Sequence, residues 1–88
     1  MRVNRGALIG HHTSIGDYST IQPGANIAGC CDIGRAVYVG IGAVVIDRVK
    51  VGAQAVIGAG SLVTKDVPDQ AIVGGSPARV VQHKAAGN

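Results

Sequence analysis

The sequence predicts an all-β fold, a triangular β-helix of about four coils. Three observations support this prediction: aliphatic residues repeat at every sixth position, small or β-branched residues follow four positions after them, and glycine columns recur every eighteen residues. Neither an α-helix nor the simple alternation of a strand keeps a period of six in this way. A fixed period of this kind indicates a solenoid.

The hexads run from the start of the chain without an insertion. Each carries a β-branched aliphatic residue: Val3, Ile9, Ile15, Ile21, Ile27, Ile33, Val39, Val45, Val51, Ile57 and Val63. The companion positions hold Ala7, Thr13, Ser19, Ala25, Cys31, Val37, Ala43, Val49, Ala55, Ser61 and Val67. Six glycines directly follow an aliphatic residue, which suggests short strands ended by turns with unusual backbone dihedrals: Gly10, Gly16, Gly34, Gly40, Gly52 and Gly58.

An eighteen-residue period shows that three hexads form one coil. Its clearest sign is the column Gly6, Gly24, Gly42 and Gly60. The coils would stack about 4.8 Å apart, as neighbouring strands do, around an interior too narrow for large rings. We therefore expect a β-helix domain over residues 1–67, followed by a C-terminal cap and tail over residues 68–88 in which residues 71–81 fold back.

The outer surface of the predicted prism carries one largely apolar column, formed by Leu8, Asn26, Val44 and Leu62. An aligned apolar stripe on a surface marks a partner site. A three-sided prism with one such stripe favours a closed ring of three identical chains.

Length and composition narrow the class of protein. The 88 residues allow one domain, and no apolar run is long enough for a membrane span or a signal peptide, so we expect a cytoplasmic protein that does not bind membranes. The net charge of +3 comes from dispersed basic residues, which argues against a nucleic-acid partner. Cys31 should point into the core and Cys30 outward, so we expect no disulfide between them.

His11 and His12 are the candidate catalytic residues, because imidazole is the side chain best suited to act as a general base near neutral pH. They lack other ligand-type residues at metal spacing, so we expect no metal site. His11 shares one edge of the prism with Gly29, Asp47 and Lys65, and Lys65 would lie about 14 Å away at strand spacing.

A long thin ligand with a reactive head and a phosphorylated tail fits this span. A second column, Pro23, Ile41 and Ala59, is small and apolar and suits an alkyl-amide arm lying in a groove. Lys65 and Arg79 either contact phosphate groups or are solvated charges near the cap.

The hexads from Val3 to Val67, followed by residues 63–68 (VTKDVP) and 75–81 (GSPARVV), resemble the left-handed parallel β-helix of the hexapeptide-repeat acyltransferases. Residues 4–11 (NRGALIGH), 15–18 (IGDY) and 21–25 (IQPGA) resemble, more narrowly, the catalytic domain of bacterial sugar acetyltransferases of the sialic-acid and bacillosamine type. This resemblance implies a homotrimer that uses acetyl-CoA, with its active site between two neighbouring prisms.

Carried over by position, the resemblance makes His11 the catalytic base and Asn4 the active-site asparagine, with His12 beside the base. His11 would take a proton from the acceptor amine or hydroxyl as it attacks the thioester, and backbone N–H groups would stabilise the oxyanion. The resemblance places acetyl-CoA contacts at Thr20, Ile41 and Ala59, and residues beside or beyond that column extend the expected acetyl-CoA site to Gly42, Lys65 and Arg79.

The sequence departs from this group in two respects. His12 stands where the group usually has an acidic residue that raises the basicity of the catalytic His, and Gly10 stands where an acidic residue is also common. The group also carries an N-terminal Rossmann-like domain that binds the nucleotide sugar. This chain begins at the prism, so we expect the acceptor-binding half to be absent.

The sequence and the resemblance leave two functions open for this chain. The first is a trimeric acetyl-CoA-dependent acetyltransferase that acts on an amine or hydroxyl of a small acceptor such as an amino sugar or nucleotide sugar, either free-standing or as part of a larger enzyme. The alternative is a non-catalytic trimeric module that is structural or holds CoA. A zinc carbonic anhydrase on the same prism would need three convergent histidines, whereas His11 and His12 are adjacent and His83 lies in the tail.

Overall fold

The structure, a computed structural model, describes the backbone of residues 2–3 and 6–83 and the side chains of residues 6–83. Within these residues the chain forms strands and turns and no helix. The strands are β1 (Arg2–Val3), β2 (Leu8–Ile9), β3 (Ser14–Ile15), β4 (Thr20–Ile21), β5 (Asn26–Ile27), β6 (Asp32–Ile33), β7 (Tyr38–Val39), β8 (Val44–Val45), β9 (Lys50–Val51), β10 (Val56–Ile57), β11 (Leu62–Val63), β12 (Ala71–Gly75) and β13 (Ala78–His83).

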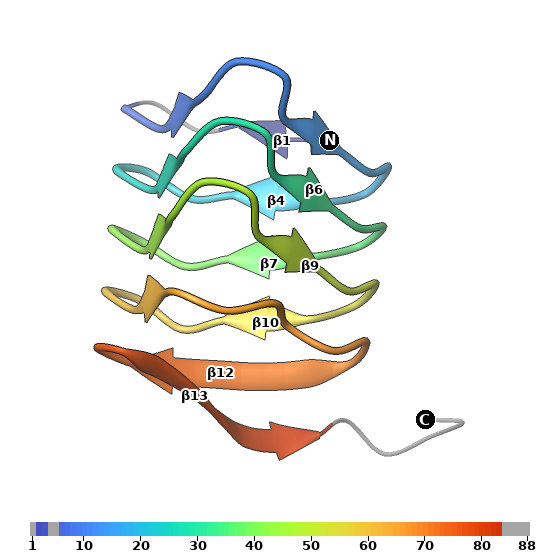
Figure 1. Cartoon of the computed structure of the whole chain (residues 1–88), viewed down its shortest axis with the longest axis vertical. Helices are drawn as coiled ribbons and strands as arrows, with labels where there is room; N and C mark the ends of the chain where they lie inside the picture. The colour runs from blue at the N-terminus through green and yellow to red at the C-terminus, as the bar shows by residue number, and fades with distance from the viewer. Residues whose placement is uncertain (1, 4–5, 84–88) are drawn as a thin grey trace.

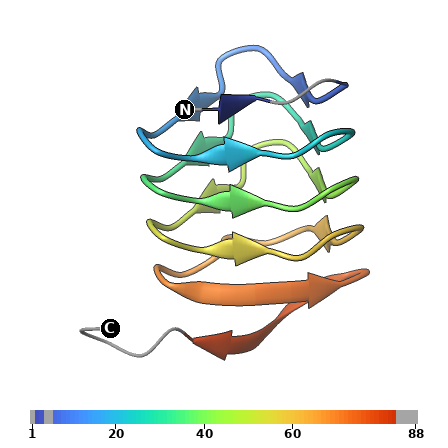
Figure 2. The ribbon, with the colours of Figure 1, turned by 180° about the vertical axis from the view of Figure 1, so that it is seen from behind.

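The coils stack into a column with three faces (Figures 1 and 2). Sheet A has the order β1-β4-β7-β10-β12-β13, sheet B the order β11-β8-β5-β2, and sheet C the order β3-β6-β9. Strands in consecutive coils pair in parallel with a separation of eighteen residues, as in Thr20 with Tyr38. The predicted three-hexad coil and the all-β parallel β-helix are therefore confirmed.

Three corners join the sheets. Corner AB comprises residues 22–25, 40–43 and 58–61; corner BC comprises residues 10–13, 28–31 and 46–49; corner CA comprises residues 16–19, 34–37 and 52–55. Each short strand therefore runs from one corner of the triangle to the next.

Both predicted hexad positions point into the column. The aliphatic residues from Ile21 to Val63 are almost completely buried, and so are the small companions between them: Ser19, Ala25, Cys31, Ala43, Ala55 and Ser61. Most outward residues of the strands are exposed, and so are both tyrosines: Tyr18 is 71% and Tyr38 is 42% exposed. Cys30 is exposed and Cys31 is buried, and both are free thiols, as the hexad rule predicts.

The glycines that follow the strands serve a purpose different from the one predicted. None of the six has a positive φ angle. A Cβ at Gly40 would lie 2.6 Å from the Ala59 backbone nitrogen, and a Cβ at Gly10 would lie 2.5 Å from that of Gly29. Glycine is needed here because the backbones of neighbouring coils approach too closely for a side chain.

The unusual dihedrals lie instead at the tips of the corners. The glycine column Gly6, Gly24, Gly42 and Gly60 has φ between 69° and 78°. Seven non-glycine residues adopt the same left-handed conformation: His12, Tyr18, Cys30, Ala36, Arg48, Gln54 and Gln70. The corner tips therefore tolerate side chains in spite of the strain that this conformation imposes.

The last coil is shorter at corner BC than the prediction allowed. Val63 pairs with Val45, a separation of eighteen residues, whereas Val67 bridges to Val51, a separation of sixteen. Two residues are thus missing between β11 and Val67. The predicted spacing of His11 and Lys65 assumed a regular column and stays a prediction.

The repeat in the sequence ends before the stack does. β12 pairs in parallel with β10 as the next strand of sheet A, and Ala71 and Val73 are buried in the same core. The predicted fold-back is made by β13, which runs antiparallel to β12. Figure 1 shows β13 lying below β12 at the end of the column.

Candidate active site

His11 and His12 lie at corner BC of the first coil, between β2 and β3. Both residues are exposed. Their ring centroids are 6.5 Å apart and the rings are tilted by 51°. His12 occupies the left-handed corner tip, with a φ of 60°. The structure thus presents two accessible imidazoles on one edge of the prism.

Backbone hydrogen bonds fix this corner against the next coil. The Gly10 N–H donates to the Ile27 carbonyl at 2.7 Å, and the Cys30 N–H donates to the His11 carbonyl at 2.9 Å. The contact between the two backbones is as close as it can be, because Gly10 lacks a Cβ. The position of the His11 backbone is therefore set by the coil that begins at β4 (Thr20–Ile21).

The small, apolar column that was predicted to suit an alkyl-amide arm lies on corner AB. The Gly42 N–H donates to the Pro23 carbonyl at 3.1 Å, and the Gly60 N–H donates to the Ile41 carbonyl at 2.8 Å. Ile41 is 59% exposed, and Gly42 and Ala59 are also exposed. Pro23, Ile41 and Ala59 therefore form the continuous, exposed edge that the sequence predicted.

Thr20 lies apart from that edge. It is in β4, paired with Tyr38 on the outer side of sheet A, and its side chain is half-buried. Within one chain it does not line a groove with Ile41.

Sheet B separates the two candidate groups. Its strands begin at corner AB, beside Ile41, and end at corner BC, the edge that carries His11. Its outer surface is the predicted apolar column, in which Leu8 is 62% and Val44 is 39% exposed. One chain thus holds the imidazoles and the apolar edge on opposite sides of an apolar face.

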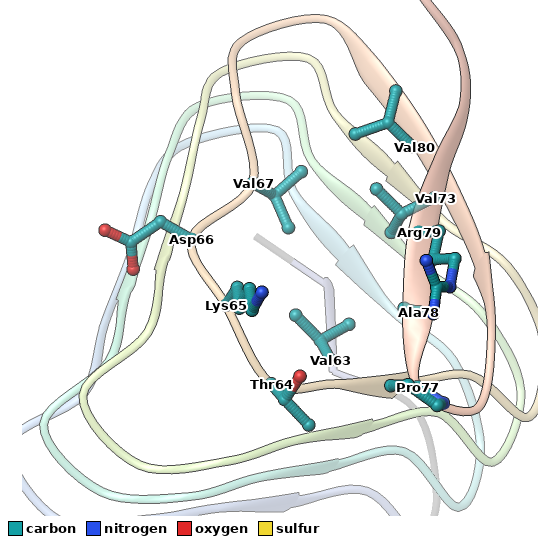
Figure 3. A pocket seen from close by; sticks show the side chains of 10 residues that line it. All are labelled: Val63, Thr64, Lys65, Asp66, Val67, Val73, Pro77, Ala78, Arg79 and Val80. Carbon is teal, nitrogen blue, oxygen red and sulfur yellow. The ribbon is translucent and has the colours of Figure 1, made fainter.

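A pocket of about 340 Å³ opens at the C-terminal end of the column. Figure 3 shows Val63, Val67 and Val73 pointing to its centre, with Lys65 and Arg79 on opposite sides. These three valines are at most 5% exposed and form an apolar floor. The remaining lining residues are Thr64, Asp66, Pro77, Ala78 and Val80.

The charges around this pocket favour an anion. Lys65 and Arg79 are exposed, and neither forms an ion pair with another residue in the described part of the chain. The Asp66 carboxylate is occupied elsewhere, because it accepts the Lys50 N–H at 3.0 Å. The sequence pointed to Lys65 and Arg79 but not to the pocket, whose only signal was the loss of the six-residue spacing after Val63.

The remaining expectations about the site concern Asn4 and a metal. Asn4 lies outside the described residues. Within residues 6–83, no three His, Cys, Asp or Glu side chains gather closely enough to hold a metal ion. The part of the chain that the structure describes also has no helix long and apolar enough to cross a membrane.

Comparisons with known proteins support the resemblance noted in the sequence. No protein-family model matches the chain. YvoF of Bacillus subtilis (strain 168), a candidate acetyltransferase, is 39% identical over 82 residues, which cover 93% of this chain and 47% of YvoF. The aligned relatives are thus longer proteins, of which this chain spans about half or less.

Solved structures share the whole fold. A variant of perosamine N-acetyltransferase from Caulobacter crescentus, in complex with CoA and GDP-perosamine, superposes with a TM-score of 0.88 at 33% identity, covering 90% of this chain and 38% of that one. The hexapeptide-repeat-containing acetyltransferase VCA0836 from Vibrio cholerae gives a TM-score of 0.73 at 26% identity, covering 89% of this chain and 62% of its own. With its six-residue repeat and its triangular left-handed β-helix, the chain belongs to the hexapeptide-repeat acetyltransferase family.

Proposed function

We propose that this chain is the catalytic part of an acetyl-CoA-dependent acetyltransferase that works in the cytoplasm as a homotrimer. The observation that carries the proposal is the placement of an exposed imidazole pair and an exposed apolar edge on the two sides of sheet B. Neighbouring chains that pack around the apolar face would bring the His11 edge of one chain to the Ile41 edge of the next. Each active site would then be shared between two chains.

The reaction is a direct transfer. The acceptor amine or hydroxyl attacks the thioester carbonyl while His11 takes its proton, the carbon–sulfur bond breaks, and the proton passes to the departing CoA thiolate. Backbone N–H groups stabilise the oxyanion during the attack. By the resemblance, Asn4 would be the active-site asparagine and His12 would stand beside the base. The exposed Cys30 is not needed as a nucleophile, because no acyl-enzyme forms.

Acetyl-CoA would lie along the prism rather than across it. Its alkyl-amide arm would rest on Ile41, Gly42 and Ala59, with Thr20 in contact on the adjoining face. Its phosphates would reach the pocket where Lys65 and Arg79 lack ion-pair partners among the described residues. Coils stacked at about 4.8 Å give the column a length comparable to that of an extended pantetheine arm.

The acceptor class we propose is an amino sugar or nucleotide sugar. The perosamine N-acetyltransferase with the same fold was solved with GDP-perosamine, and the resemblance in residues 4–25 points to sugar acetyltransferases. A non-catalytic trimeric module that is structural or holds CoA is the competing function, since fold alone does not decide activity.

A calorimetric titration of the purified chain with acetyl-CoA tests the proposal, together with a mass measurement on the same sample. We expect saturable binding of one acetyl-CoA per chain in a trimer. A second assay would follow release of the CoA thiol with a panel of amino sugars, including GDP-perosamine. A folded trimer that binds acetyl-CoA but acetylates no acceptor would support a non-catalytic module that holds CoA. A folded trimer without binding would overturn the acetyltransferase in favour of a structural module.

Replacing His11 separates the catalytic function from the binding function. We expect His11→Asn to lower kcat about 10²- to 10⁴-fold, the range typical of a lost general base, while the trimer mass and the affinity for acetyl-CoA are retained. His83→Asn, which changes an exposed imidazole in β13, is the matched control and should keep full activity. Equal activity of the His11→Asn variant and the wild type would exclude His11 as the base.

A further inference from the structure

Thr13 lies two residues after His11 and joins the first coil to the second. Its hydroxyl donates to the Ala28 carbonyl at 2.7 Å and accepts the Cys31 N–H at 3.2 Å. These two partners lie on either side of Cys30 in the sequence, and the Cys30 N–H donates a hydrogen bond to the His11 carbonyl. We infer that Thr13 is a positioning residue that fixes the catalytic corner, an inference that rests on the proposed function of His11.

In the described structure, the corner that carries His11 is hydrogen-bonded to a neighbouring coil on one side only. β2 and β3 are end strands of sheets B and C in the described structure, so the coil that carries His11 has a neighbour only in the direction of β5 and β6. Every described hydrogen bond that orders residues 10–13 across coils therefore goes to residues 27–31. Loss of the Thr13 hydroxyl would remove two of these contacts and leave the His11 backbone held by the bonds of Gly10 and Cys30.

The fold itself does not demand a hydroxyl at this position. One coil further along the same column, Cys31 Sγ donates to the Ile46 carbonyl at 3.1 Å. One coil beyond that, the residue is Val49, which is buried and has no polar group to offer. At the corresponding position of corner AB, the Ser61 hydroxyl is buried without any hydrogen-bond partner among the described residues. A hydroxyl bonded on both sides is thus a local feature of the His11 coil and its neighbouring corner.

Corner CA supplies a matched control. Ser19 Oγ donates to the Gly34 carbonyl at 2.8 Å and accepts the Val37 N–H at 3.1 Å, with the same residue separations as for Thr13. The Ala36 N–H donates to the Asp17 carbonyl there, as the Cys30 N–H does to that of His11. Ser19 therefore makes the same pair of hydrogen bonds, which we call the clamp, at a corner that carries no candidate catalytic residue.

The experiment compares Thr13→Val, Thr13→Ser and Ser19→Ala with the wild type. We expect Thr13→Val to lower kcat about tenfold to a hundredfold, as small displacements of a catalytic group do, while the KM for acetyl-CoA is unchanged. Thr13→Ser, which keeps the hydroxyl, should restore kcat, and Ser19→Ala should leave it at the wild-type value. A general loss of stability would affect Thr13→Val and Ser19→Ala alike.

Amide hydrogen exchange gives a readout that does not require activity. We expect the Cys30 amide to exchange faster in Thr13→Val, and the Ala36 amide to exchange faster in Ser19→Ala, each without a change at the other corner. An active wild type whose kcat survives Thr13→Val, or falls equally in Ser19→Ala, would overturn the inference. If the wild type transfers no acetyl group, the proposed function fails, and amide exchange alone tests the inference. Faster exchange in Thr13→Val that is confined to Cys30 would then support the clamp, and unchanged exchange at Cys30 would overturn it.

Discussion

At the scale of single residues, the glycines that follow the strands and the glycines at the corner tips are needed for different physical reasons. Gly40 has ordinary dihedrals, and a Cβ there would meet the backbone of the next coil. Gly60 has a φ of 69°, and a Cβ there would meet no atom within 4 Å. Tight stacking therefore requires the first glycine, whereas the corner tip only prefers the second, as Ala36 and Gln54 demonstrate by occupying the same conformation.

This difference predicts that the same substitution lowers the free energy of unfolding by unequal amounts at the two positions. We expect Gly40→Ala to lower the free energy of unfolding by about 3 kcal/mol, because the coils must move apart. Gly60→Ala should cost only about 1 kcal/mol, the strain of a left-handed alanine. Urea unfolding at one protein concentration measures both values, and equal costs would show that the close approach of the coils is not what selects Gly40.

At the scale of the elements, the shortened corner at the end of the column replaces backbone acceptors with side chains. In regular coils a strand N–H donates to a carbonyl of the next coil, as Ser14 does to Cys31 at 3.0 Å. At the corner where two residues are missing, the Lys50 N–H donates instead to Asp66 Oδ1 at 3.0 Å, and at the following corner the Ala53 N–H donates to Asp69 Oδ1 at 2.9 Å. The two aspartates thus allow the stack to continue to β12 after the hexads stop.

Removing one of these carboxylates should loosen the end of the stack. We expect Asp66→Ala to cost about 1 kcal/mol of unfolding free energy, the value of one exposed hydrogen bond, and Asp66→Asn to recover most of it because the amide oxygen still accepts. Asp47→Ala is the matched control, since Asp47 is exposed and its carboxylate pairs only with Arg48, at 3.6 Å, among the described residues. Thermal unfolding distinguishes the outcomes, and an Asp66→Ala variant as stable as Asp47→Ala would refute the assigned role.

At the scale of the whole molecule, the three faces of the prism differ in polarity. The outer residues of sheet C are Ser14, Asp32 and Lys50, all exposed, and Ser14 Oγ donates to Asp32 Oδ1 at 3.1 Å. Sheet B instead presents Leu8 and Val44, large apolar side chains that water contacts in the single chain. Association through sheet B would remove this apolar surface from water and leave the polar face of sheet C outside.

A charge on sheet B should therefore dissociate the proposed trimer. We expect Val44→Lys to shift the mass toward the monomer and to weaken acetyl-CoA binding, because an unpaired ammonium would be buried between chains. Ser14→Lys adds the same charge to sheet C and should leave the mass unchanged. Light scattering at matched concentrations gives the result, and a Val44→Lys trimer as stable as the wild type would exclude sheet B from the interface.

The coil, the core and the outward residues could all be predicted from the repeat in the sequence. A strict period of six can be satisfied in only one way, with every aliphatic residue inside, so the burial of Ile21 or Val45 follows from spacing alone. The exposed edges at His11 and Ile41 could be predicted for the same reason. The resemblance in residues 4–25 added the expected chemistry.

Features that depend on contacts between coils could not be predicted from the repeat and are seen in the folded chain alone. The space around Gly40, the two-residue shortening before Val67 and the pocket between Lys65 and Arg79 arise where backbone from distant parts of the chain meets. The clamp made by Thr13 was equally invisible in the sequence, because threonine is simply one of several small residues allowed at its position. The six-residue period predicts whether a side chain points into or out of the column, whereas the neighbouring coil determines which atoms it contacts.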